Sequence, residues 1–109
     1  MNIEFLSPQL RELCASERQA VRELGQSGAK KLFARLADLR AAHHVGELVA
    51  GKPHPLKYDR SGQFAVSLEG GKRLVFRSAN EPVPLSDDGS VDWKRVTRAC
   101  IVFIGDYHD

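Results

Sequence analysis

Residues 54–77, HPLKYDRSGQFAVSLEGGKRLVFR, decide how the rest of the chain is organised. Two runs within it, residues 63–68 and 72–77, alternate between apolar and smaller or polar side chains, a period of two that is typical of β-strands with one buried face. The residues on the side predicted to be buried are Phe64, Val66, Leu68, Leu74 and Phe76. Gly70 and Gly71 lie between the runs and allow a tight turn, so the sequence predicts a β-hairpin.

Positive charge is concentrated in and just before this hairpin. Residues 52–77 hold six cations and two anions, a net charge of +4, whereas the whole chain carries +2, so the remaining residues sum to −2. The cations are Lys52, Lys57, Arg60, Lys72, Arg73 and Arg77. This asymmetry indicates contact with a polyanion such as RNA or DNA, and a solvated strand face is the alternative interpretation.

Length and composition are those of one folded domain spanning residues 1–109. Of the 109 residues, 42% are hydrophobic and 28% are charged, which is typical of a globular protein and unlike a disordered chain. No apolar run approaches the roughly 20 residues of a membrane-spanning helix. The first residues, MNIEFLSPQL, lack the basic and apolar regions of a secretory signal, so we expect a cytoplasmic protein.

The cysteines and histidines show no metal-binding pattern. Cys14 and Cys100 each stand without a second Cys or a His at a metal-like spacing, and we expect both to be small buried hydrophobes rather than a disulfide. The side chains of His43 and His44 diverge if they lie on a helix, so we expect surface residues there. No metal site is predicted.

An apolar start at residues 3–6, predicted to be an edge strand, precedes two helices. Ser7 and Pro8 are typical of a helix start, and the first helix is expected to continue to Gly25. A second helix is expected over residues 27–42. The link between them is short, so we expect an antiparallel helix hairpin that covers one face of a sheet.

The C-terminal third combines a long loop with a last strand. Residues 78–92 contain Pro, Gly and Asp clusters that favour a surface loop, and a helical turn is expected at residues 93–96. Residues 97–104 alternate with apolar residues on both sides, which is typical of a central strand. One predicted face holds Ala99, Ile101 and Phe103, and the other holds Cys100, Val102 and Ile104. The fold class is therefore α+β with a mainly antiparallel sheet.

Five residues have the chemistry needed to cleave RNA if the fold brings them together: His54, Lys57, Arg73, Tyr107 and His108. Attack of a ribose 2′-OH on the adjacent phosphate needs a base, an acid and positive charge near the phosphoryl oxygens. Imidazole exchanges protons near neutral pH, and Tyr can stack on a base. The remaining cations of this region, Lys52, Arg60, Lys72 and Arg77, are predicted to bind RNA phosphates.

Each of these residues also has a structural interpretation. A single His in a Pro-rich loop can be structural, Arg73 can pair with Glu69, and a terminal Tyr can simply pack. The set as a whole favours a nuclease, because the chain has no acidic catalytic pair, nucleophile motif or phosphate-binding loop that points to another activity.

Three blocks of the sequence resemble a known toxin family. They are HPLK with DRSGQF (residues 54–57 and 59–64), KRLVF (residues 72–76) and the terminal DYH (residues 106–108). In this order, and behind two predicted helices, they resemble the HigB-type (host inhibition of growth, or plasmid maintenance killer) toxins of the RelE/ParE superfamily. The resemblance spans nearly the whole chain.

This resemblance implies a small RelE/ParE-like fold and a ribosome-dependent mRNA endonuclease that needs no cofactor. It implies that a cognate helix-turn-helix antitoxin neutralises the protein, and that the ribosome and mRNA are its targets. The family's active-site residues fall on His54, Lys57, Arg73 and Tyr107, and His108 completes the terminal motif.

Two features depart from the resemblance. Residues 80–96, which we call the insert, are longer than in the shortest members of the family, and Asp109 follows the terminal motif. The insert is a candidate contact for the antitoxin or the ribosome. The superfamily also includes toxins that act on DNA gyrase without cutting RNA, so a non-catalytic toxin, or a protein that binds only its antitoxin repressor, is the alternative function.

Overall fold

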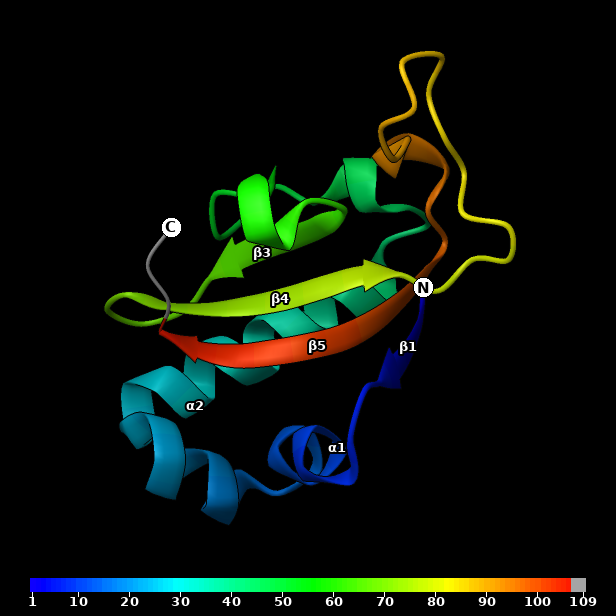
Figure 1. Ribbon diagram of the computed structural model, residues 1–109. Helices are drawn as coiled ribbons and strands as arrows, with labels where there is room; N and C mark the ends of the chain where they lie inside the picture. The colour runs from blue at the N-terminus through cyan, green and yellow to red at the C-terminus, as the bar shows by residue number, and fades with distance from the viewer. Residues whose placement is uncertain (107–109) are drawn as a thin grey trace.

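The computed structural model describes residues 1–106 as two helices packed on a five-stranded sheet (Figure 1). The helices are α1 (Pro8–Ala15) and α2 (Glu17–Ala41), and the strands are β1 (Asn2–Phe5), β2 (His54–Pro55), β3 (Gln63–Ser67), β4 (Lys72–Ser78) and β5 (Arg98–Asp106). The strand order is β1-β5-β4-β3-β2, with β1 parallel to β5 and every other neighbour antiparallel. The predicted α+β fold is confirmed.

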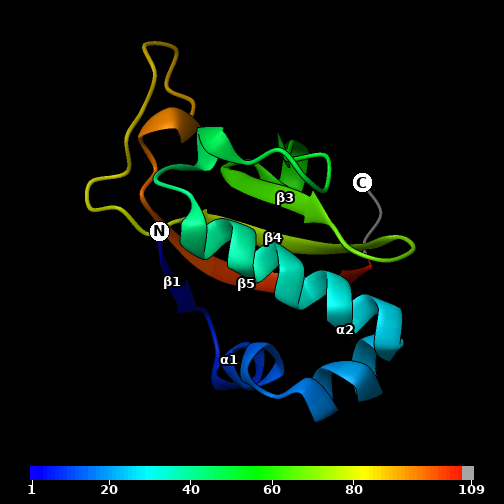
Figure 2. The same ribbon diagram turned by 180° about the vertical axis from the view of Figure 1, so that it is seen from behind.

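One face of the sheet is covered by α2, and the opposite face of β3, β4 and β5 carries no α-helix from the described residues (Figures 1 and 2). We call this opposite face the open face. β1 is an edge strand and β5 an interior strand, as predicted. The predicted turn after β3 is present, with Gly70 at a φ of 64° and the Leu68 amide donating to the Lys72 carbonyl at 2.9 Å. The main core therefore lies on the α2 side of the sheet, and the open face carries a smaller buried cluster of Leu56, Ala65 and Val75.

The helices begin where expected but divide at a different residue. Ser7 caps α1 by accepting a hydrogen bond from the Leu10 amide at 3.2 Å, and Pro8 occupies the first turn. The predicted continuation of this helix to Gly25 is wrong, because α1 ends at Ala15 and Ser16 caps α2 by accepting from the Gln19 amide at 3.1 Å. The Ser-x-x-Gln pattern favours a new helix start there.

Gly25 bends α2 instead of ending a helix. Its φ of 77° and ψ of 171° lie inside α2, where the second predicted helix was expected to begin after a short link. This region of backbone conformation is essentially reserved for glycine. The bend lets the first part of α2 lie near α1 while the second part crosses the sheet (Figure 2).

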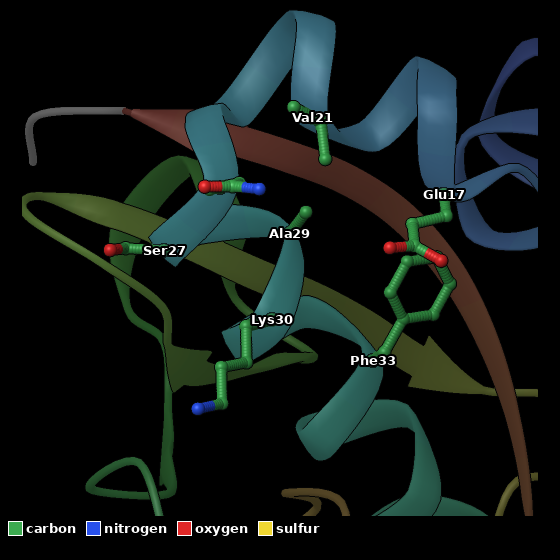
Figure 3. A pocket seen from close by; sticks show the side chains of 7 residues that line it. Glu17, Val21, Ser27, Ala29, Lys30 and Phe33 are labelled. Atoms are coloured by element: carbon green, nitrogen blue, oxygen red, sulfur yellow. The ribbon is translucent and has the colours of Figure 1, made fainter.

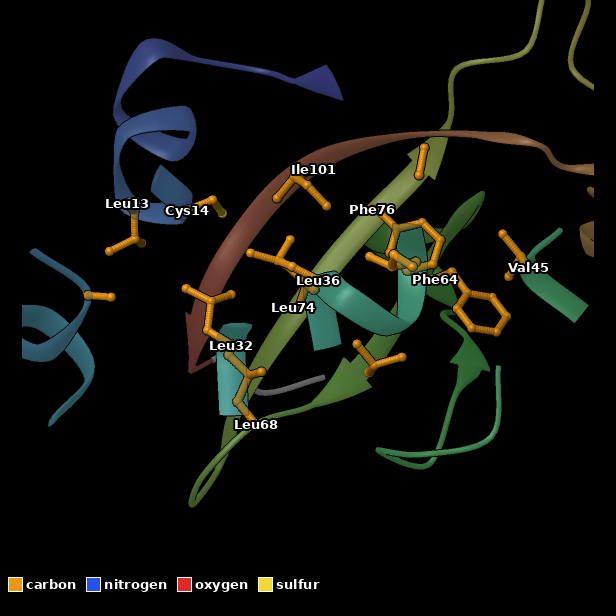
Figure 4. Close-up of a cluster of buried hydrophobic side chains, with 14 of the residues drawn as sticks. Leu13, Cys14, Leu32, Leu36, Val45, Phe64, Leu68, Leu74, Phe76 and Ile101 are labelled. Atoms are coloured by element: carbon orange, nitrogen blue, oxygen red, sulfur yellow. The ribbon is translucent and has the colours of Figure 1, made fainter. Parts of the chain in front are cut away.

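The main core lies between α2 and the sheet (Figure 4). Leu32 and Leu36 of α2 and Leu74 and Phe76 of β4 are fully buried, at 0% exposure. Phe64 of β3 joins them, as the hairpin pattern predicted. The same cluster includes Cys14, and both cysteines are free and buried, as expected. Burial raises the pKa of the Cys14 thiol to about 11, so it is protonated at neutral pH.

A β-bulge in β5 changes the faces that the sequence predicts. Val75 pairs with Phe103 whereas Phe76 pairs with Ile101, so Val102 is an extra residue on β5. Phe103 therefore packs with Val102 on the open face and Ile104 packs against the main core. The prediction that placed Phe103 with Ile101 and Ile104 with Val102 is wrong, because strict alternation does not continue through a bulge.

The remaining segments are short turns and loops. Val45–Glu47, Tyr58–Arg60 and Trp93–Arg95 form 3₁₀ turns, and the last of these was expected. Residues 54 and 55, predicted as loop, form the short edge strand β2, because their backbone pairs with Ala65 and Phe64. Across residues 1–106, no helix combines the length and the apolar character needed to cross a membrane.

Candidate functional site

Residues 51–62, which we call the site loop, run along the β2 edge of the sheet and carry His54 and Lys57. Two hydrogen bonds anchor the loop to β3, from the Ser67 amide to the Gly51 carbonyl at 2.7 Å and from the Leu56 amide to the Gln63 carbonyl at 2.9 Å. Lys52 and Tyr58 have positive φ angles of 50° and 57°. Such conformations are uncommon outside glycine and cluster at functional sites, which favours a functional role for the loop.

His54 lies exposed at the edge of the open face. It pairs with Ala65 across β2 and β3, and paired residues point to the same side of a sheet. Its Nδ1 lies 2.8 Å from the Lys52 carbonyl oxygen. A carbonyl only accepts hydrogen bonds, so Nδ1 carries a proton and donates it. In the neutral ring Nε2 therefore keeps its lone pair and is able to accept a proton.

Arg73 is half-buried on β4, on the same face as His54. Its Nη1 donates to the Lys72 carbonyl at 3.2 Å, and no ion pair joins it to Glu69 or to any other acid within residues 1–106. Arg73 lies two strands away from His54, which is about 10 Å across an ideal sheet. It is also displaced by two residues, about 7 Å, along the strand direction. The guanidinium is therefore available to an anion bound between the two.

The predicted cations give this side of the molecule a charge that the described acids do not neutralise. Lys52, Lys57 and Arg77 are exposed and Lys72 is half-buried. In the part of the chain that the structure describes, none of these four forms an ion pair, and the pairs that are present involve Arg35, His43, Arg95 and Arg98. Unpaired cations on the site loop and on β4 favour binding of a phosphate backbone.

Arg60 and Phe103 form a contact that the sequence did not predict. The Arg60 guanidinium carbon lies 4.6 Å from the centre of the Phe103 ring, within the range of a cation–π interaction. Arg60 Nη1 also donates to the Gln63 side-chain oxygen at 3.1 Å. The bulge that turns Phe103 onto the open face has no clear signature in the sequence, so Phe103 was assigned to the wrong side.

The structure thus brings some of the predicted site residues together. His54 and Arg73 share the open face, and Lys57 follows His54 on the site loop. Tyr107 and His108, the predicted C-terminal members, lie outside the described residues. Asp106, the last described residue, places its carboxylate beside Gly71, so β5 ends next to the turn that precedes Arg73.

A cavity lies away from the open face, in the helical layer at the bend of α2 (Figure 3). It encloses about 420 Å³, and Glu17, Val21, Lys30 and Phe33 line it. These residues come from the two parts of α2 and not from the open face, so this cavity is separate from the predicted site. No three His, Cys, Asp or Glu side chains of residues 1–106 gather closely enough to hold a metal ion.

Comparison with known proteins relates the chain to a group of toxins through its structure. No protein-family model matches the sequence, and no curated protein matches it either. A YoeB/ParE toxin from Agrobacterium tumefaciens superposes with a TM-score of 0.59 and 16% identity over 99% of this chain and 100% of that one. A YoeB dimer from Staphylococcus aureus superposes with a TM-score of 0.57 and 22% identity over 100% of this chain and 98% of the matched chain.

A YoeB–YefM complex from Staphylococcus aureus gives a TM-score of 0.56 with 21% identity over 100% of this chain and 98% of the matched chain. These similarities extend over essentially the full length of each chain, although the identities are low. The resemblance to HigB-type toxins stays a prediction, because these structures are YoeB or YoeB/ParE proteins. The chain therefore has the fold of the YoeB and ParE toxins.

Proposed function

We propose that this protein is the toxin of a type II toxin–antitoxin system and that it cleaves mRNA on the ribosome. The observation that carries the proposal is the placement of His54 and Arg73 on an open, basic face of a fold shared over its full length with toxins. An enzyme acting on translating ribosomes works in the cytoplasm, in agreement with the localisation expected from the sequence.

In the proposed reaction, the ribose 2′-oxygen attacks the adjacent phosphorus as the bond from phosphorus to the 5′-oxygen breaks. His54 Nε2 takes the proton of the 2′-OH, because the hydrogen bond to the Lys52 carbonyl places the proton of the neutral ring on Nδ1. Arg73 and Lys57 stabilise the charge that develops on the phosphoryl oxygens. Tyr107 and His108 are proposed to give a proton to the leaving oxygen. This chemistry uses protein groups alone, so we propose no cofactor.

The proposed partners are a cognate antitoxin, the ribosome and mRNA. Two of the matched structures are complexes of YoeB with YefM, and this supports an antitoxin as the partner that neutralises the present chain. The helix-turn-helix character of that antitoxin follows from the HigB-type resemblance. Lys52, Arg60, Lys72 and Arg77 are proposed to hold the RNA backbone around the cleavage site.

The test uses purified protein and mRNA bound to ribosomes. We expect the wild type to cut ribosome-bound message, Arg73→Ala to lose at least a hundredfold in rate, and Arg18→Ala, an exposed arginine on α2, to match the wild type. The same preparations are added to a DNA gyrase supercoiling assay. Inhibition of supercoiling with uncut message would reject the nuclease and favour a gyrase toxin.

A further inference from the structure

A small pocket lies between the insert (residues 80–96) and the site loop. It encloses about 210 Å³, below the roughly 300–1,000 Å³ of pockets for drug-sized ligands, which suits a single flat ring system. Pro55, Ser61 and Gln63 form one wall, and Ser90, Val91 and Trp93 form the other. Building on the function proposed above, we propose that this pocket binds one nucleobase of the mRNA beside the cleaved phosphate.

The insert forms an ordered wall. Its tip is closed by hydrogen bonds from the Ser86 amide to the Ser90 carbonyl at 2.7 Å and from the Gly89 amide to the Ser86 carbonyl at 2.9 Å. Its base is held by Asn80, whose side-chain oxygen accepts from the amides of Thr97 and Arg98 at 3.1 Å each. A pre-formed wall binds a ligand without the cost of ordering a loop.

The aromatic wall of the pocket is also fixed. The Trp93 ring packs against Phe64 at 4.9 Å and Phe76 at 6.3 Å between ring centres, so it is anchored to the main core. The remaining part of this half-buried side chain lines the pocket. Contacts between bases and aromatic side chains are a common source of affinity in single-stranded nucleic acid complexes, because every base has an aromatic face.

Polar groups in the walls match the edge of a base. Ser61 is an exposed residue of one wall, and its hydroxyl is able to donate and to accept a hydrogen bond. Ser90 donates its hydroxyl proton to Asp88 at 2.6 Å and keeps acceptor capacity on the oxygen. Hydroxyl groups set among apolar walls give a binding site hydrogen-bonding groups for the edge of an unstacked base.

The location ties the pocket to cleavage. Pro55 follows His54 directly, and Ser61 follows Arg60. The pocket therefore lies on the other side of the segment that carries His54, the proposed general base, and the cations Lys57 and Arg60. An RNA strand whose phosphates contact Lys57 can turn a neighbouring base over the β2 edge into the pocket. The pocket then sets which base the enzyme prefers next to the cut.

Binding is tested directly because the chain contains a single tryptophan. The indole N–H resonance of Trp93 is followed by NMR while each of the four ribonucleoside monophosphates is added, with ribose phosphate as the ligand that lacks a base. We expect saturable shifts with nucleotides and none with ribose phosphate. Ser61→Phe, which fills the pocket from an exposed position, should weaken binding at least tenfold, whereas Ser86→Phe should not.

The second readout is the sequence around cleavage sites. Ser61→Phe should still cut mRNA but lose the base preference at one position beside the cut, and Ser86→Phe should keep it. Equal shifts with ribose phosphate, no saturable shift, or unchanged preference in Ser61→Phe would overturn the base pocket. Nucleotide shifts in a wild type that cuts no message would reject the proposed nuclease while leaving the pocket as a base-binding site.

Discussion

At the scale of single residues, the hydrogen bond between His54 and the Lys52 carbonyl determines what the imidazole is able to do. It holds the proton on Nδ1 and leaves Nε2 to act as a base. His54→Ala should therefore slow ribosome-dependent cleavage by about 10²–10⁴-fold, the usual contribution of general acid–base catalysis. Single-turnover cleavage of ribosome-bound mRNA measures the effect.

The matched control for this substitution is His43→Ala. His43 is also an exposed histidine, but it lies just beyond α2 and contacts Glu47. It should leave the cleavage rate unchanged. A His54→Ala enzyme with the wild-type rate would show that another group is the base.

Single residues also show what the sequence could and could not predict about the site. His54, Lys57 and Arg73 were predicted from their chemistry and their order in three sequence blocks, and their roles stay predictions. The Arg60–Phe103 contact and the pocket that Gln63 and Trp93 line were not predicted. Those depend on a bulge and on an insert that folds back, and neither leaves a local pattern of hydrophobic residues.

At the scale of secondary structure, the bend in α2 depends on Gly25. A Cβ at this position would meet no other atom within 4 Å, so a side chain causes no steric clash there. The loss of stability comes from holding a residue other than glycine at a φ of 77°. Gly25→Ala should lower the free energy of unfolding by about 1–3 kcal/mol. Urea denaturation of this variant beside Gln26→Ala, an exposed helical neighbour, checks the prediction. Equal stability of Gly25→Ala and the wild type would contradict it.

The insert is expected to loosen in acid. Hydrogen bonds from Ser90 lower the pKa of Asp88, and the side-chain hydrogen bond from Arg95 lowers the pKa of Asp92. A carboxyl whose folded pKa lies below its unfolded value stabilises the fold above the unfolded pKa, about 4, and loses that contribution as pH falls through the folded pKa. Stabilisation of the insert should therefore be complete above about pH 4.

NMR shifts of the Gly89 and Ser90 amides during an acid titration measure this effect. The double variant Asp88→Asn, Asp92→Asn should lose the acid transition, whereas Asp87→Asn, at an exposed neighbouring residue, should keep it. A transition of the same size in the double variant would contradict the assignment of the effect to these two carboxylates.

The elements themselves were predictable where local signals agree with packing. The hairpin of β3 and β4 followed from its alternation, and the start of α1 followed from Ser7 and Pro8. The division at Ser16 was missed because the apolar spacing continues through it, although its capping pattern was present. The two-residue β2 was missed because only pairing with β3 makes it a strand.

At the scale of the whole molecule, positive charge is concentrated in residues 52–77, which form the site loop and the β3–β4 hairpin. The rest of the chain carries a net negative charge. RNA binding should therefore weaken steeply with salt, because binding releases counterions from the phosphates. Lys57→Ala should weaken binding and reduce the slope of log affinity against log salt by about 0.7–0.9. Filter binding of a single-stranded RNA over a salt series tests this.

The control for the salt series is Lys31→Ala. Lys31 is exposed on α2, in the helical layer, and should leave both the affinity and its slope unchanged. An identical loss of slope in the two variants would mean that RNA binds through net charge and not through the site loop.

The most direct test of the account is the mapping of mRNA ends during growth arrest, after tightly controlled expression in bacteria. Wild type is compared with Arg73→Ala and with Arg18→Ala by primer extension on abundant messages. We predict in-frame cuts for wild type and Arg18→Ala and none for Arg73→Ala, which should fold normally because Arg73 is only half-buried and is not a residue of the buried core. Growth arrest without new mRNA ends, or equal cutting by Arg73→Ala, would contradict an RNA-cleaving site on the open face.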